Sequence, residues 1–232
     1  MDARIQAHSN YLIYQFKQAG TSMTPPIVIP FRPVDSKKRL KDIMSQEERE
    51  GFARAMLSDV IWTVIDAGCA PVLLTTKEIS DIDARVKVIT LDLGLNEALD
   101  VFRKEQSGPF GIVMADLALC DTKSIHSLMH PSADFCIAPG MGGGTNAIYI
   151  RDGSAFIAQY YGSSFLKHLS WAEKQGYSIE VVDSFRLSTD IDEPSDLVEV
   201  LIHTKRNTAA YLHKIGFMLS AEEGRVCVKR VQ

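Results

Sequence analysis

The sequence predicts an α/β fold, a single domain with a mostly parallel, mixed sheet flanked by helices. From residue 26 onward, segments typical of strands alternate with segments typical of helices, which is the pattern of a parallel sheet with helical connections. The continuous apolar run at 111–114 is typical of a strand buried on both faces. A chain of 232 residues also fits one domain better than two.

The first strand is expected at 26–30 and is followed by a loop at 31–39. Ser45 and Glu48 have the spacing of a capping box, so a helix is expected to begin there. Gly68 is expected to end it. Its apolar face is formed by Phe52, Met56, Val60 and Val64.

The remaining elements alternate in the same way. Strands are expected at 71–75, 86–89, 111–114, 135–138, 147–150 and 179–182. Helices are expected at 96–104, 122–129 and 165–175, with one more beginning near Pro194. We expect Thr122, Ser164 and Asp192 to act as helix N-caps. Ligands of such sheets gather at the carboxyl ends of the strands, and Asp116 follows one of these ends.

The composition indicates an ordinary globular protein, with 46% hydrophobic and 23% charged residues. A net charge of −4 gives no general attraction to polyanions, so we expect neither a nucleic acid nor a membrane partner. No apolar run has the length of a membrane span, and no secretory signal is evident. The four scattered cysteines fit reduced thiols. We therefore expect a cytoplasmic protein.

Residues 1–22 are mixed, polar and aromatic, and Met23 stands just before the first strand. We interpret 1–22 as an accessory N-terminal leader and 23–232 as the working domain. A homodimer is one option for the assembly, although no exposed apolar stripe can be named from the sequence.

Three aspartates are candidate metal ligands. Asp190 and Asp192 stand two residues apart before a predicted helix, and Asp116 follows a predicted core strand. Carboxylates in such positions can hold Mg²⁺ beside a phosphate, which points to nucleotide chemistry. The alternative is that Asp116 forms a turn while Asp190 and Asp192 cap the next helix.

A glycine-rich loop and a helix start are candidate substrate contacts. Four of the seven residues at 140–146 are glycines, which lets main-chain N–H groups approach an anion, and Thr145 offers a hydroxyl. A flexible turn is the alternative. Ser163 and Ser164 precede or open the next helix, where an N-cap role and an anion site are both compatible with the sequence.

The loop after the first strand is basic. It contains Arg32, Lys37, Lys38 and Arg39. Because it follows the carboxyl end of a strand, these residues are placed to meet a triphosphate. The alternative is a solvated run of surface charges.

Together these segments resemble the archaeal 2-phospho-L-lactate guanylyltransferase family. They occur in the family's order and cover essentially everything from Pro26 onward. The matching segments are PFR at 30–32, SKKRL at 36–40, LNEAL at 95–99, MADL at 114–117, GGGTN at 142–146, YGSSF at 161–165 and TDIDEP at 189–194.

The resemblance implies a nucleotide-diphospho-sugar transferase fold of the glycosyltransferase-A-like type, with GTP, Mg²⁺ and a small phosphorylated acid. The acid is 2-phospho-L-lactate or phosphoenolpyruvate, and the product leads to coenzyme F-420. The implied metal ligands are Asp116, Asp190 and Asp192. The implied acceptor contacts are Thr145, Gly162 and Ser164, and Ser163 is added as their neighbour. The implied nucleotide contacts are Arg32, Lys37, Arg39 and Asn96.

The implied reaction is in-line attack of the acceptor phosphate on the α-phosphorus of GTP, with Asp116, Lys37 and Arg39 as catalytic residues. The nucleophile is already an anion, so no general base is required. Arg32 stands where the family commonly has lysine, and Lys38 where it has a small residue. The alternatives are a nucleotidyltransferase with a sugar phosphate or the molybdenum cofactor as acceptor, a glycosyltransferase, or a non-catalytic nucleotide-binding module.

Overall fold

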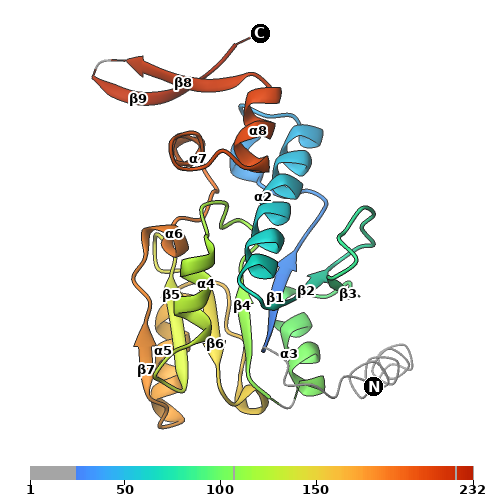
Figure 1. Ribbon diagram of the computed structural model, residues 1–232, viewed down its shortest axis with the longest axis vertical. Helices are drawn as coiled ribbons and strands as arrows, with labels where there is room; N and C mark the ends of the chain where they lie inside the picture. Colours follow the sequence, from blue (N-terminus) through green and yellow to red (C-terminus); the bar gives the residue numbers. More distant parts are fainter. Residues whose placement is uncertain (1–24, 107, 223, 232) are drawn as a thin grey trace.

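The computed structural model describes residues 25–106, 108–222 and 224–231. The proposed leader at 1–22 lies outside these residues. The described chain is built around a seven-stranded sheet with the order β3-β2-β1-β4-β6-β5-β7 (Figure 1). Its strands are β1 (Pro26–Phe31), β2 (Ala70–Thr75), β3 (Lys87–Thr90), β4 (Phe110–Val113), β5 (Phe135–Pro139), β6 (Thr145–Ile150) and β7 (Ile179–Val181).

The sheet is mixed, as predicted. β6 runs antiparallel to both of its neighbours, β4 and β5. The other neighbouring strands pair in parallel. Six of the seven strands therefore end toward the same edge of the sheet, and this edge gathers the loops that carry the candidate site residues.

Helices cover both faces of the sheet. They are α2 (Gln46–Asp66), α3 (Leu95–Glu105), α4 (Thr122–Met129), α5 (Ser164–Lys174), α6 (Phe185–Ser188), α7 (Leu197–His203) and α8 (Asn207–Lys214). Alternate residues of β1 separate the two cores: Ile27 and Ile29 pack toward α2 and α4, whereas Val28 packs toward α3 and α5. This follows from the two-residue period of a strand.

Helix α2 begins and ends as the sequence predicts. The Ser45 side chain accepts a hydrogen bond from the Glu48 N–H, and the Glu48 carboxylate accepts one from the Ser45 N–H, completing the capping box. Gly68, with φ +73°, follows the C-cap residue Ala67. Positive φ suits glycine because it has no Cβ.

The three predicted N-caps were wrong. Asp121, not Thr122, caps α4 through the Ser124 N–H at 2.9 Å. Ser163, not Ser164, precedes α5, and its side chain makes no capping bond. Asp192 lies before a 3₁₀ turn, η3 (Pro194–Asp196), that Glu193 caps.

The reason for the last error is local. The Asp196 carboxylate accepts the backbone N–H of Asp192 at 2.9 Å and that of Glu193 at 2.7 Å. Asp196 thus binds the N–H groups of the two residues that precede the turn, whereas the Asp192 carboxylate contacts Lys37 and Arg39.

The C-terminal region contains elements that were not predicted. Helix α8 is followed by the hairpin β8 (Phe217–Glu222) and β9 (Arg225–Arg230), which lies beyond α7 and α8 in Figure 1. The buried Asp59 of α2 holds the start of α8, because its carboxylate accepts bonds from the Thr208 N–H at 2.9 Å and the Asn207 N–H at 3.1 Å. The hairpin therefore extends from an anchored helix.

Two further expectations concern the cysteines and membranes. Cys69, Cys120, Cys136 and Cys227 are free thiols. Among the helices of the described ranges, none combines the length and apolar character that crossing a bilayer requires.

Candidate active site

Two adjoining cavities lie at the carboxyl ends of the strands. The first, which we call the apolar cavity, has a volume of about 260 Å³ and lies among the ends of β1 and β2, the segment after β3 and the start of α3. The second, the charged cavity, has a volume of about 210 Å³, and its wall includes Lys37, Asp116 and Asp192. Arg32 and Met114 line both cavities, so one ligand can extend through the two.

Lys37 brings two of the predicted aspartates together. Its side chain is 9% exposed, and its backbone is left-handed, with φ 52°. The Nζ atom lies 2.8 Å from Asp116 Oδ2 and 2.7 Å from Asp192 Oδ1. Burial lowers the pKa of Lys37, but the charges of Asp116 and Asp192 outweigh burial and hold that pKa above its ordinary value. The lysine is therefore charged and occupies the space between the carboxylates.

The pKa of Asp192 shifts in the opposite direction to that of Lys37. Burial raises the pKa of its carboxyl, but the neighbouring Lys37 charge outweighs this, so the pKa lies below its ordinary value. Arg39 adds a weaker contribution from a more exposed position, with Nη1 3.5 Å from Asp192 Oδ2.

Asp190 faces a different partner. Its Oδ1 atom accepts a hydrogen bond from Asn146 Nδ2 at 3.1 Å, and the same amide donates to the Leu187 carbonyl at 2.9 Å. Burial raises the pKa of Asp190, and the negative charges of Asp116 and Asp192 raise it further. The three aspartates are thus close enough to affect one another electrostatically.

The predicted magnesium trio is nevertheless not assembled as a cation site. Within the ranges that the structure describes, no three His, Cys, Asp or Glu side chains are grouped to hold a metal. The physical reason is that the Lys37 ammonium already bridges Asp116 and Asp192, while Asp190 is bonded to Asn146.

One atom still fits a metal role. Asp116 Oδ1 is buried and has no hydrogen-bond partner among the described residues. An unpaired buried carboxylate oxygen is costly, and a hard cation such as Mg²⁺ prefers oxygen ligands. The donor set is therefore chemically suited to Mg²⁺, and the metal assignment stays a prediction.

The other basic residues divide into two groups. Arg32 lines both cavities, as a nucleotide contact would. Lys38, in contrast, pairs with Asp35 at 2.6 Å, and both side chains are exposed. The basic loop therefore contributes Arg32 and the buried Lys37 to the cavity walls, and the exposed Arg39 contacts Asp192. Lys38 belongs to the solvated surface.

The glycine loop forms a tight turn beside α5. Gly142 and Gly143 have φ of +83° and +87°, and the Gly143 carbonyl accepts the Phe165 N–H at 3.3 Å. A Cβ atom at Gly140 would lie 2.4 Å from the Asn146 side chain. Gly140, Gly142 and Gly143 are therefore favoured by the geometry of the loop. The loop brings the helix start with Gly162, Ser163 and Ser164 close to β6.

Thr145 and Ser164, two predicted acceptor contacts, are buried, at 4% and 3% exposure. Thr145 Oγ1 lies 3.0 Å from Nδ1 of His168, a residue that was not singled out from the sequence. The Gln159 N–H donates to His168 Nε2 at 3.0 Å. Since Nε2 accepts, a neutral ring carries its proton on Nδ1 and donates it to Thr145. The threonine hydroxyl hydrogen is then free to donate to another group.

Asn96 does not face either cavity directly. Its Nδ2 atom donates to the Tyr160 carbonyl at 3.1 Å, and its Oδ1 accepts the Tyr160 N–H at 2.8 Å. Its neighbours Leu95 and Tyr161 line the apolar cavity. Asn96 thus connects the start of α3 to the segment before α5, and a direct contact with the nucleotide stays a prediction.

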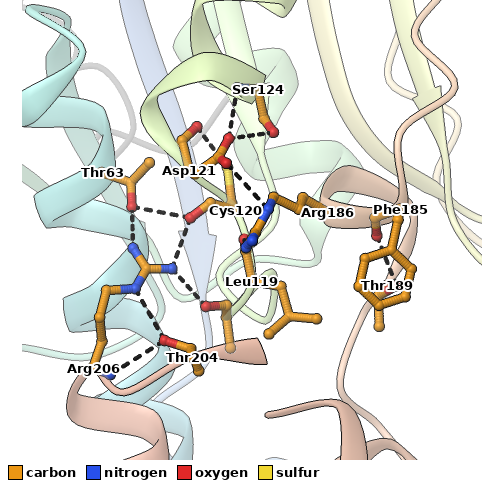
Figure 2. A network of polar contacts seen from close by, with 11 residues as sticks. Thr63, Leu119, Cys120, Asp121, Ser124, Phe185, Arg186, Thr189, Thr204 and Arg206 are labelled. Atoms are coloured by element: carbon orange, nitrogen blue, oxygen red, sulfur yellow. Dashed lines mark hydrogen bonds and ion pairs between the residues drawn. The ribbon is translucent and has the colours of Figure 1, made fainter. Parts of the chain in front are cut away.

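Two arginines that were not predicted hold the loop after Asp116 (Figure 2). Arg206 donates to the carbonyls of Ala118 and Cys120, each at 2.7 Å. Arg186 donates to the Leu119 carbonyl at 2.9 Å. The bonded residues are 67, 86 and 88 positions apart in the sequence, so no local sequence pattern reveals these bonds. They fix the loop whose first residues follow the catalytic candidate Asp116.

The fold is of the nucleotide-diphospho-sugar transferase type. A solved structure described as a putative nucleotide-diphospho-sugar transferase from Desulfovibrio desulfuricans G20 superimposes with a TM-score of 0.70, covering 83% of this chain and 95% of that one. The sequence identity of that pair is 13%, so the likeness concerns the fold.

The family model described as "Guanylyl transferase CofC like" matches residues 25–232, and the chain belongs to this family. Its relatives include the 2-phospho-L-lactate guanylyltransferase of Methanosphaerula palustris, which is 49% identical over 208 residues, or 90% of this chain and 99% of the relative. The enzyme of the same name from Methanoregula boonei is 48% identical over 210 residues, with 90% and 96% covered.

Proposed function

We propose that this chain transfers GMP from GTP to 2-phospho-L-lactate, or to phosphoenolpyruvate, with release of pyrophosphate, in the biosynthesis of coenzyme F-420. The observation that carries the proposal is the charged cluster of Lys37, Asp116 and Asp192 beside a cavity with apolar walls. An apolar cavity suits a nucleobase, and buried charges beside it suit a phosphate chain.

The proposed binding mode follows the two cavities. The nucleoside lies in the apolar cavity, and the phosphates extend past Arg32 toward Lys37. The acceptor lies on the side of the glycine loop and the start of α5. There the partial positive charge at the N-terminus of α5 and the free hydroxyl hydrogen of Thr145 favour an anion.

The proposed chemistry forms one bond and breaks one. An oxygen of the acceptor phosphate attacks the α-phosphorus of GTP, and the bond to the bridging oxygen of the β-phosphate breaks as pyrophosphate leaves. Lys37 and Arg32 neutralise charge on the phosphates. Asp116 and Asp192, with Asp190, would hold Mg²⁺, which when bound supplies further charge neutralisation at the phosphates.

The test is to incubate the purified protein with GTP and Mg²⁺ and with each acceptor in turn. The acceptors are 2-phospho-L-lactate, phosphoenolpyruvate, 3-phosphoglycerate and a hexose phosphate. We expect pyrophosphate release with the first two, and a conjugate whose mass equals GMP plus the acceptor minus water. Release with the hexose phosphate alone, or with no acceptor in the panel, would contradict the proposal.

A further inference from the structure

Tyr161 combines an unfavourable backbone with an exposed ring. Its φ is +88°, in the left-handed region that favours glycine. The side chain is nevertheless large and aromatic, and the residue is 62% exposed. A non-glycine residue in such a conformation is costly and is maintained where the surroundings or a function require it.

The ring reaches across to another element. The Tyr161 hydroxyl accepts the Leu95 N–H at 3.3 Å, and the Tyr161 carbonyl accepts Lys167 Nζ at 2.8 Å. The adjacent Asn96 and Tyr160 exchange two more bonds across the same junction. The tyrosine is therefore held in place at both its backbone and its tip, although most of its surface faces solvent.

The held ring forms part of the apolar cavity. The other walls come from the ends of β1 and β2, the segment after β3 and the start of α3, whereas Tyr161 comes from the segment between β6 and α5. Tyr161 lines this cavity together with Leu93 and Leu95, although Leu95 is 66 positions away in the sequence. An exposed aromatic face fixed at the mouth of an apolar cavity is suited to stack on a planar base.

We propose that Tyr161 is a nucleoside-binding residue whose ring packs against the base of the bound nucleotide. The inference rests on the proposed function, since it takes the apolar cavity as the nucleoside site. It explains why a strained tyrosine stands where a glycine would be accommodated without cost. It assigns the phosphate contacts to other residues, because the ring lies outside the charged cavity.

The backbone strain at Tyr161 allows the ring to be removed by substitution without an expected loss of stability. In Tyr161→Gly the ring is lost and the positive φ becomes favourable, so the variant should melt at the same temperature as the wild type or higher. Tyr161→Asn provides a second variant, because asparagine also tolerates this conformation. Tyr161→Phe retains the ring and loses only the hydroxyl bond. The matched control is Asp81→Gly, at an exposed position with φ 61° that lines neither cavity.

The measurement is the Kd of a non-hydrolysable GTP analogue in the presence of Mg²⁺, alongside the Kd of inorganic tripolyphosphate. Loss of one base–aromatic contact weakens binding by about 5- to 140-fold. We expect this loss in Tyr161→Gly and Tyr161→Asn, with tripolyphosphate binding unchanged. Tyr161→Phe and Asp81→Gly should bind the analogue within about threefold of the wild type, the change expected when no stacking contact is removed.

Three results would overturn the inference in distinguishable ways. If the wild type binds the analogue and Tyr161→Gly binds it equally well, the ring does not contact the base, and the proposed function is unaffected. If the wild type binds no nucleoside triphosphate, the proposed function fails and the inference fails with it. Equal weakening of the analogue and of tripolyphosphate would also contradict a base contact.

Discussion

Lys37 determines the charge balance at the candidate site. It is the only basic side chain that contacts both Asp116 and Asp192 within the described part of the chain. Its ammonium lies in the space that a divalent cation would need in order to bind both carboxylates. A lysine in this place can neutralise the site before a metal–nucleotide complex arrives, and it can then contact the phosphates.

Replacing Lys37 with methionine should therefore affect the metal and the reaction in opposite directions. Without the competing ammonium, we expect Mn²⁺ to bind more tightly in the absence of nucleotide, measured by electron paramagnetic resonance or calorimetry. Turnover should fall about 100-fold or more, the usual cost of removing one electrostatic donor from an active site. Lys38→Met, at an exposed neighbour paired with Asp35, is the control and should change neither quantity. Weaker Mn²⁺ binding in Lys37→Met would contradict the competition.

His168 makes stability depend on pH. Burial lowers its pKa from 6.5 to about 4, with a smaller contribution from the Lys167 charge. The unfolded chain therefore takes up a proton on this histidine below pH 6.5, whereas the folded protein takes it up only near pH 4. The histidine's contribution to stability is present above pH 6.5 and is lost as the pH falls from 6.5 to about 4.

We expect the free energy of unfolding of the wild type to fall relative to that of His168→Gln by up to about 3 kcal/mol across this window. Urea unfolding of both proteins at several pH values measures the difference. His126→Gln, at an exposed histidine, should retain the wild-type dependence. A constant difference between wild type and His168→Gln would show that His168 is not buried in its neutral form.

At the residue scale the sequence identified the charged groups but not their pairing. Asp116, Asp192 and Lys37 were all named as candidates. Lys37 is separated from the two aspartates by 79 and 155 positions, and which carboxylate it contacts depends on how the strand ends are arranged in space. His168 and Arg206 were missed for the same reason, because a buried histidine and a structural arginine have no distinctive local pattern.

At the scale of elements, the loop between β4 and α4 shows how distant residues support the site. This loop carries Asp116 at its start and Asp121 at its end, and its carbonyls are bound by Arg206 and Arg186 (Figure 2). The Ile191 N–H also donates to the Asp116 carbonyl at 3.3 Å. The segment with Asp190 and Asp192 is thereby connected directly to the loop that carries the third aspartate.

Arg206→Met should destabilise the protein by about 2–3 kcal/mol, because the Ala118 and Cys120 carbonyls lose a charged donor. The measurement is urea unfolding, with turnover as a second readout, since a displaced loop moves Asp116. Arg151→Met removes an exposed ion pair with Asp134 and one hydrogen bond to the Ala133 carbonyl and should cost about 1 kcal/mol or less. Equal effects of the two substitutions would contradict the role given to Arg206.

Element positions were predicted well where local chemistry decides them. The capping box at Ser45 and Glu48 defines the start of α2 because both bonds form within one turn. The N-caps at Thr122, Ser164 and Asp192 were wrong because the N-cap position falls on the adjacent residue in each case, at Asp121, Ser163 and Glu193. A single sequence does not fix a helix start to within one residue.

At the scale of the whole molecule, the fold class was predictable because the order of strands and helices follows from the hydrophobic pattern of the sequence. The insertion of β6 between β4 and β5 was not, since it depends in part on pairing with β4, which does not directly precede β6 in the chain. The hairpin of β8 and β9 was missed, although Gly224 between two strand-like segments is a turn signal that could have revealed it. The homodimer stays a prediction.

The division into a leader at 1–22 and a domain at 23–232 predicts different results for truncation at the two ends. Every strand of the sheet and every residue of the two cavity walls comes from residues 26–192. Removing residues 1–22 should therefore leave the melting temperature and the turnover unchanged. Both are measured on the shortened and full-length proteins under the same conditions.

Removing residues 216–232 provides the contrasting truncation and should lower the melting temperature. Phe217 is buried at 4% exposure, and Arg230 binds the Ile43 carbonyl and the Glu48 carboxylate near the start of α2. Loss of these contacts exposes part of the core beneath α7 and α8, and burial of one large apolar side chain contributes about 1.5–3 kcal/mol. If the N-terminal truncation lowers turnover while the C-terminal one does not, the leader belongs to the working domain and the division is wrong.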